Sequence, residues 1–136
     1  MNSMLFHSFT IPMATTYGDK KDFVKRELIR EAALVNFPQS SRDRATYWGF
    51  RIHVKKNPRP KKSFDLENVP KLIVDAFCVK QIQSRKTPST FSQVGLYDDD
   101  TIDHVRMILV TGERTTGQSE TLVEIHCWRE GEVISF

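Results

Sequence analysis

Four separate segments of the chain place similar residues at every second position, and this period of two constrains the fold more than any other feature. Side chains along a β-strand point alternately to opposite faces of a sheet, so each segment is typical of a strand with one buried face. The clearest of them spans residues 48–54. The alternating sets are Leu5, His7, Phe9 and Ile11; Trp48, Phe50, Ile52 and Val54; Val105, Met107 and Leu109; and Val123, Ile125 and Cys127.

Two further segments show the spacing of amphipathic helices. Residues 22–35 repeat apolar side chains every three or four positions, and the sequence Asn-Phe-Pro at 36–38 ends that pattern. A second, shorter apolar face lies between residues 69 and 77. The two predicted apolar faces consist of Val24, Leu28, Ala32 and Val35, and of Val69, Leu72, Ile73, Ala76 and Phe77.

The predicted order of elements is β-α-β-α-β-β, which indicates an α/β (mixed α+β) fold. Four strands and two helices are expected to form a four-stranded mixed sheet with the helices in a second layer. At 136 residues the chain fits one domain spanning residues 1–136. Gly112 and Gly117 frame a loop between the last two strands, which favours an antiparallel hairpin. Residues 78–94 read as a long connection.

The composition is that of a soluble globular protein, with 39% hydrophobic and 27% charged residues. No run approaches the roughly 18 apolar residues of a membrane span. The first residues, MNSMLFHSFTIP, lack the basic and apolar regions of a secretory signal, so we expect a cytoplasmic protein without membrane contact. Cys78 and Cys127 are far apart and are expected to be buried apolar residues rather than disulfide partners or zinc ligands.

Charge is segregated along the chain. Residues 55–62 carry five positive charges and no negative one, whereas Asp98, Asp99 and Asp100 are consecutive, with Asp103 close behind. Such separation suits a protein that holds a polyanion with one patch and divalent cations with another. The alternative for each segment is an ordinary solvated loop or turn.

The stretch from Phe64 to Phe77 carries the most chemical information. Pro70 lacks an amide proton and fits only the first turn of a helix, so the helix is expected to begin near Leu66 or Glu67, with Asp65 at or just before the cap. Glu67 and Lys71 then lie opposite the apolar face, and Asp75 continues their side. The alternative is that the acids at the helix start are ordinary caps and that Glu67, Lys71 and Asp75 form an i,i+4 ion ladder.

The acidic run before the third strand would complete a metal site. Mg²⁺ keeps several waters and takes a few carboxylates from the protein, so a pair of acids at a helix start and one acid at a strand end would suffice. Three consecutive like charges repel one another, which favours a counterion. The alternative remains a solvated acidic turn.

The sequence DLENVPKLIVDAF, at residues 65–77, followed by DDDTI, at 98–102, resembles the RusA-type Holliday-junction resolvases, a family of endodeoxyribonucleases. Their pattern is Asp-Leu-Asp-Asn, a lysine six residues after the first Asp, a helical Asp-Ala-Leu, and a later Asp-Asp before a strand. Residue-level similarity is confined to these two blocks. The resemblance implies Mg²⁺-dependent hydrolysis of phosphodiester bonds in branched DNA, with Mn²⁺ as a possible substitute, by a homodimer that matches a four-way junction.

Carried over by position, Asp65 and Glu67 match the first two metal ligands and Lys71 matches the essential lysine. Asp99 matches the third metal ligand, with Asp100 as the alternative. Asn68 and Asp75 match positions with a structural part. The chain departs from the pattern at Glu67, which replaces the usual Asp, and in its longer loop at 78–94.

Backbone phosphates of DNA are expected to bind the basic side chains, so affinity should fall steeply with salt. Two other functions stay open on the sequence alone. One is a catalytically inactive DNA-binding protein of the same fold, and the other is a metal-dependent nuclease without junction preference. The predicted DNA-binding residues are Lys55, Lys56, Arg59, Lys61, Lys62, Lys71, Arg85 and Lys86.

Overall fold

The computed structural model describes residues 4–39, 46–59, 63–83 and 93–132. The predicted order of strands and helices is confirmed, with one helix more than expected. That helix, α3, lies inside the segment predicted to be a long connection. The elements are β1 (Met4–Ile11), α1 (Asp22–Leu34), β2 (Thr46–Lys56), the 3-10 helix η1 (Leu66–Asn68), α2 (Pro70–Ala76), α3 (Val79–Gln83), β3 (Val105–Arg114) and β4 (Glu120–Arg129).

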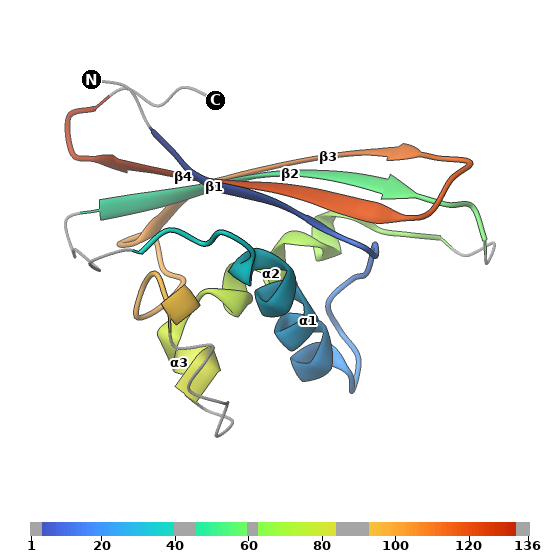
Figure 1. The fold of residues 1–136 in the computed structure, drawn as a ribbon, viewed down its shortest axis with the longest axis horizontal. Helices are drawn as coiled ribbons and strands as arrows, with labels where there is room; N and C mark the ends of the chain where they lie inside the picture. Colours follow the sequence, from blue (N-terminus) through green and yellow to red (C-terminus); the bar gives the residue numbers. More distant parts are fainter. Residues whose placement is uncertain (1–3, 40–45, 60–62, 84–92, 133–136) are drawn as a thin grey trace.

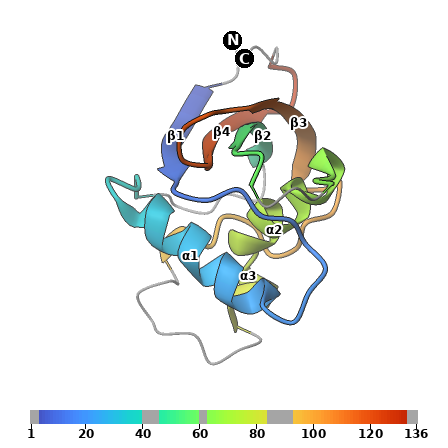
Figure 2. The same cartoon turned by 90° about the vertical axis from the view of Figure 1, so that its right-hand side faces the viewer.

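The four strands form one mixed sheet in the order β1-β4-β2-β3. The β1–β4 and β4–β2 pairs are antiparallel, whereas β2 and β3 are parallel. A parallel pair needs a crossover connection, and η1, α2 and α3 supply it. All three α-helices lie on the same side of the sheet, so the fold has the two layers that the sequence predicts (Figures 1 and 2).

The predicted hairpin between the last two strands is wrong, because β2 lies between β3 and β4. The connection at 115–119 instead passes the end of β2. Asn57, just beyond that end, donates its side-chain amide to the carbonyl of Gly117 at 2.8 Å, and its backbone N–H donates to Ser119 Oγ at 2.8 Å. Asn57, distant in sequence, therefore forms hydrogen bonds with this loop. The spacing of the two glycines alone could not reveal that arrangement.

The core lies between the sheet and α2. The predicted apolar face of α2 is confirmed, because Val69, Leu72, Ile73, Ala76 and Phe77 are all buried. They pack in one hydrophobic cluster with inward side chains of β2 and β4 such as Phe50 and Ile125. Each fully buried side chain of this size stabilises the fold by about 1.5–3 kcal/mol. Val74 and Asp75 are buried as well, so Lys71 is the exposed residue of α2.

The predicted apolar face of α1 is largely wrong. Val24, Leu28 and Val35 are exposed, and the helix buries Ile29, Arg30 and Ala33 instead. Arg30 explains the difference, because its Nε–H donates at 2.7 Å to the backbone carbonyl of Ala76, at the end of α2. Helix-end carbonyls need such donors, and the apolar stem of an arginine packs well in a core.

Both cysteines are buried free thiols, as predicted. Burial raises the pKa of each thiol. Trp48 and Trp128 are also buried. Within the described ranges, no helix combines the length and the apolar character needed to cross a membrane.

Candidate functional site

The first predicted site segment lies at the start of the crossover. Asp65 takes the cap position of η1, and Pro70 is the first residue of α2, as its missing amide proton requires. Asp65 and Glu67 are both exposed. Leu66 packs against β3 so closely that a Cβ on Gly112 would lie 2.9 Å from Leu66 Cδ1. The carboxylates of η1 therefore lie near the end of β3.

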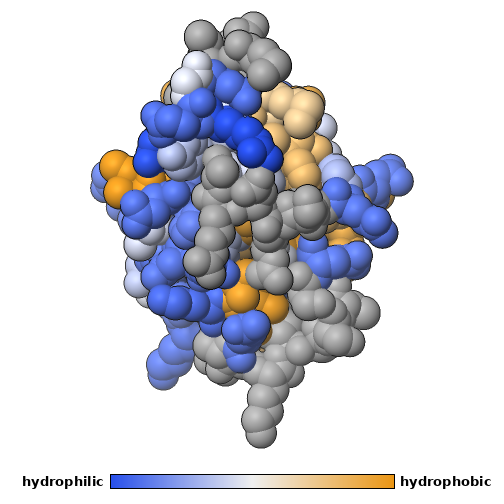
Figure 3. All heavy atoms as spheres, turned by 90° about the vertical axis from the view of Figure 1, so that its left-hand side faces the viewer, coloured by the Kyte–Doolittle hydropathy of each residue, from blue (hydrophilic) through white to orange (hydrophobic). Residues whose placement is uncertain are grey.

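The acidic turn, residues 98–100, lies at the other end of α2. The backbone N–H of Leu96 donates to the carbonyl of Phe77 at 2.9 Å, and Cys78 Sγ donates to the carbonyl of Asp98 at 3.4 Å. Buried Tyr97 donates its hydroxyl to the carbonyl of Val74 at 2.5 Å. This end lies at the left of Figure 1, and Figure 3 shows that its described surface is mainly hydrophilic, with isolated apolar patches.

A compact ionic cluster forms where the turn meets α2. Lys71 Nζ lies 3.2 Å from Asp75 Oδ2 and 3.7 Å from Asp100 Oδ2. The carboxyl of Asp100 lies near enough to Asp75 to raise the pKa of Asp75. Asp75 was expected on the outer side of the helix, but only 4% of its side chain is exposed. The acidic turn covers it, which the periodicity of α2 could not reveal.

Asp99 forms an ion pair with a different lysine. Lys80 Nζ, on α3, lies 3.0 Å from Asp99 Oδ2, and the N–H of Asp100 donates to Asp99 Oδ1 at 2.9 Å. We call Lys71, Asp75, Lys80, Asp99 and Asp100 the α2 acid cluster. It contains three carboxyl groups and two ammonium groups, so one carboxyl is left to be balanced by a proton or a further cation.

The pKa shifts follow from this arrangement. Burial raises the pKa of Asp75, Lys71 opposes that rise, and Asp100 adds to it. Partial burial lowers the pKa of Lys71, but the charges of Asp75 and Asp100 outweigh it and the net shift is upward. The hydrogen bond from Lys80 lowers the pKa of Asp99. Asp75 therefore takes up a proton more readily than Asp99.

The structure brings together only part of the predicted set. Asp65 and Glu67 lie at one end of α2 and Asp99 at the other, and a helix of seven residues spans about 10 Å. In the portion of the chain that the structure describes, no three His, Cys, Asp or Glu side chains are grouped to hold a metal ion. The residues that do meet are Lys71, Asp75 and Asp100, of which Asp100 was the alternative to Asp99.

Three further residues of interest were not among the predicted site residues. Lys80 lies in the segment read as a loop, where no periodicity marked it. Tyr17 lies near Lys71, with the ammonium 5.7 Å from its ring centroid. Arg114 ends β3 and lines a cavity of about 230 Å³ with Lys56 and Phe64. The one sequence signal for Tyr17 was that it is an aromatic residue in a loop that contains Thr and Gly.

The predicted DNA-binding residues are partly described. Lys55 Nζ lies 3.7 Å from Glu120. Lys56 Nζ donates to the carbonyls of Asn57 at 3.0 Å and Arg59 at 3.3 Å. Arg59 is exposed. Lys61, Lys62, Arg85 and Lys86 lie outside the described residues.

No known protein family model matches this chain, and no curated protein is similar to it in sequence. The resemblance to RusA-type resolvases therefore stays a hypothesis drawn from the two sequence blocks.

Proposed function

We propose that this protein is a Mg²⁺-dependent endonuclease that hydrolyses phosphodiester bonds in branched DNA, as in Holliday-junction resolution during recombination and repair. The observation that supports this best is the meeting of Asp75 and Asp100 beside Lys71. These residues come from the two sequence blocks that resemble the RusA-type resolvases. Blocks more than twenty residues apart contribute side chains to one cluster, as a shared site requires.

The donor set of the cluster suits a hard divalent cation. Mg²⁺ takes one or two carboxylates from a protein and keeps several waters. The carboxylates of Asp75 and Asp100 both lie beside the Lys71 ammonium, at 3.2 and 3.7 Å, and the cluster has one more carboxyl than ammonium groups. We therefore assign Asp100, rather than Asp99, as the ligand from the acidic turn. Asp65 and Glu67 stay proposed ligands from η1, and Mn²⁺ would suit the same oxygen donors.

The bound cation would lower the pKa of a coordinated water and stabilise negative charge on the reacting phosphate. The chain's own residues supply the rest. Lys71, with 47% of its side chain exposed, can bind a phosphate oxygen while it keeps contact with Asp75. Lys80, on α3, binds the carboxylate of Asp99 and so holds the acidic turn beside α3. Lys55, Lys56 and Arg59 would bind backbone phosphates further from the cut.

The partners and the compartment follow from the same proposal. A four-way junction has two-fold symmetry, so a homodimer would place one site on each of two strands. DNA as substrate is consistent with a cytoplasmic protein. Both statements rest on the resemblance.

A second candidate is a DNA-binding protein of the same fold that does not cleave. Asp99 is engaged by Lys80, and the ammonium of Lys71 contacts both Asp75 and Asp100. With both lysines in place, much of the cluster's negative charge is balanced without a metal ion. A structural ion network of this kind is what the second candidate requires.

A cleavage assay separates these functions. A synthetic four-way junction and a duplex of matching sequence are incubated with the protein in Mg²⁺ and, separately, in EDTA. The proposal expects Mg²⁺-dependent cutting of the junction, its loss in Asp100→Asn, and retained junction binding in that variant. Binding without cutting would identify the inactive DNA-binding protein. Equal cutting of junction and duplex would leave a nuclease without junction preference.

A further inference from the structure

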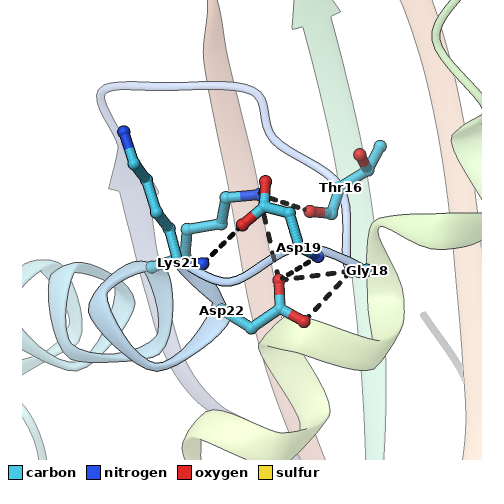
Figure 4. A network of polar contacts seen from close by, with 6 residues as sticks. Thr16, Gly18, Asp19, Lys21 and Asp22 are labelled. Carbon is cyan, nitrogen blue, oxygen red and sulfur yellow. Dashed lines mark hydrogen bonds and ion pairs between the residues drawn. The ribbon is translucent and has the colours of Figure 1, made fainter.

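Tyr17 lies on an exposed loop whose backbone is held in place by several hydrogen bonds. Lys25 Nζ donates to the carbonyl of Thr16 at 2.7 Å and to Asp19 Oδ2 at 2.8 Å. The carboxylate of Asp22 accepts the backbone N–H groups of Gly18 at 3.0 Å and Asp19 at 3.3 Å. Figure 4 shows these contacts closing the loop onto the start of α1. The backbone beside Tyr17 is thus fixed from both sides.

The geometry of Gly18 allows this turn. Its φ of +120° lies in a region that residues with a Cβ rarely adopt. Gly18 therefore supplies, directly after Tyr17, a backbone conformation that another residue would adopt only with strain. Asp19, the next residue, lies 2.8 Å from the ammonium of Lys25.

The same loop is joined to the candidate site. The backbone N–H of Tyr17 donates to the carbonyl of Asn68, in η1, at 2.8 Å. Lys71 Nζ lies 5.7 Å from the centroid of the Tyr17 ring, within the range of a cation–π contact. Tyr17 thus contacts both η1, through its backbone, and the lysine of the α2 acid cluster, through its ring.

The side chain of Tyr17 is nevertheless 43% exposed. An aromatic ring that stands on a fixed backbone, remains open to solvent and lies beside the ammonium proposed to bind a phosphate has the features of a stacking platform for nucleobases. Bases at the branch point of a junction have lost a stacking neighbour, and each offers a free π-face.

We infer that the Tyr17 ring stacks on a base at the branch point, next to the phosphate that Lys71 binds. This inference rests on the proposed function, because it requires branched DNA as the ligand. It adds a contact that recognises structure rather than sequence, since every base has a π-face. The ring is the group that acts, and the hydroxyl is not required.

The test uses a four-way junction that carries 2-aminopurine at the branch point, in EDTA so that no strand is cut. Affinity is measured by anisotropy, and stacking by quenching of the 2-aminopurine fluorescence. Tyr17→Ala should weaken junction binding about tenfold and abolish the quenching, because base–aromatic stacking contributes strongly to such affinities. Tyr17→Phe should retain both. Binding of the matching duplex should change little in either variant.

Leu28→Ala is the matched control, since Leu28 on α1 is 44% exposed and belongs to the outward side of that helix. Its junction affinity should equal that of the wild type. Thermal melting should show all three variants folded, because each changes an exposed side chain. The inference is overturned if Tyr17→Ala binds the junction like the wild type, or if Tyr17→Phe loses as much affinity as Tyr17→Ala. A wild-type protein that does not bind the junction would instead refute the proposed function itself.

Discussion

Lys71 reaches along one turn of α2 to Asp75, and its ammonium lies 3.2 Å from a carboxylate that is almost fully buried. The pair is one step of the i,i+4 ion ladder Glu67-Lys71-Asp75 that the sequence left open as an alternative. It also contacts Asp100 of the acidic turn, so the ladder and the proposed site share the same atoms. A substitution at one of these residues is therefore expected to change both the stability of the fold and the proposed cleavage activity.

Lys71→Ala should lower the free energy of unfolding by about 1–2 kcal/mol at pH 7, because it leaves a buried carboxylate without its cation. The effect is moderate because the lysine is partly exposed and water screens the pair. It should shrink near pH 4, where Asp75 is more readily protonated. Urea denaturation at both pH values measures it, with Lys20→Ala as the exposed control. An equal loss in both variants at pH 7 would contradict the pairing.

Asp75→Asn should change the pH dependence of stability in a defined direction. Burial raises the pKa of Asp75 above its ordinary value of 3.8, so the folded state binds this proton more tightly than the unfolded state. The contribution of Asp75 to stability is thus complete below pH 3.8 and is lost as pH rises through the raised pKa. Relative to the wild type, Asp75→Asn should therefore gain stability as pH rises from about 4 to 7, as denaturant titrations across this range can show.

Asp100→Asn and Asp99→Asn should differ in cleavage. Asp100 faces Lys71 and Asp75, whereas Asp99 is bound by Lys80. We expect Asp100→Asn to lower the rate of Mg²⁺-dependent junction cleavage at least 100-fold, on the order of the loss of one strong electrostatic contact in an active site. Asp99→Asn should retain more activity. Single-turnover rates measure both, and the reverse order would return the ligand role to Asp99.

The basic segment should determine how steeply DNA affinity falls with salt. Replacing Lys56 or Arg59 with Gln should each lower the slope of log affinity against log salt by about 1, since one phosphate contact is lost. Arg129→Gln is the control, because Arg129 pairs with Thr46 at the other end of β2. Anisotropy titrations from 50 to 200 mM salt give the slopes. An unchanged slope in both Lys56→Gln and Arg59→Gln would place the DNA elsewhere.

Gly112→Ala should disturb η1, because the added Cβ would lie 2.9 Å from Leu66 Cδ1. Leu66 can shift part of the way, so we expect a loss of about 1 kcal/mol. Gly117→Ala should be close to neutral, since its Cβ would meet nothing nearer than Thr115 Oγ1 at 3.7 Å. Chemical denaturation compares the two. A loss of cleavage in Gly112→Ala alone would also link the position of η1 to activity.

Local patterns in the sequence determined the elements of this protein. Three features could be predicted from the chain alone: the alternation in β2, the position of Pro70 and the apolar face of α2. Each depends on backbone geometry and on neighbours within a few residues. The mixed two-layer fold followed from their order. Asp65 at the cap and the exposure of Glu67 and Lys71 were predicted for the same reason.

Only the tertiary structure decided which elements and side chains meet. Three features depend on contacts between residues far apart in sequence. They are the placement of β2 between β3 and β4, the burial of Arg30 on α1 and the covering of Asp75 by the acidic turn. The free energies of such contacts come from burial and charge pairing across elements, which no local periodicity records. The choice of Asp100 over Asp99 beside Lys71 belongs to this second kind, because adjacent residues in a turn point to different neighbours.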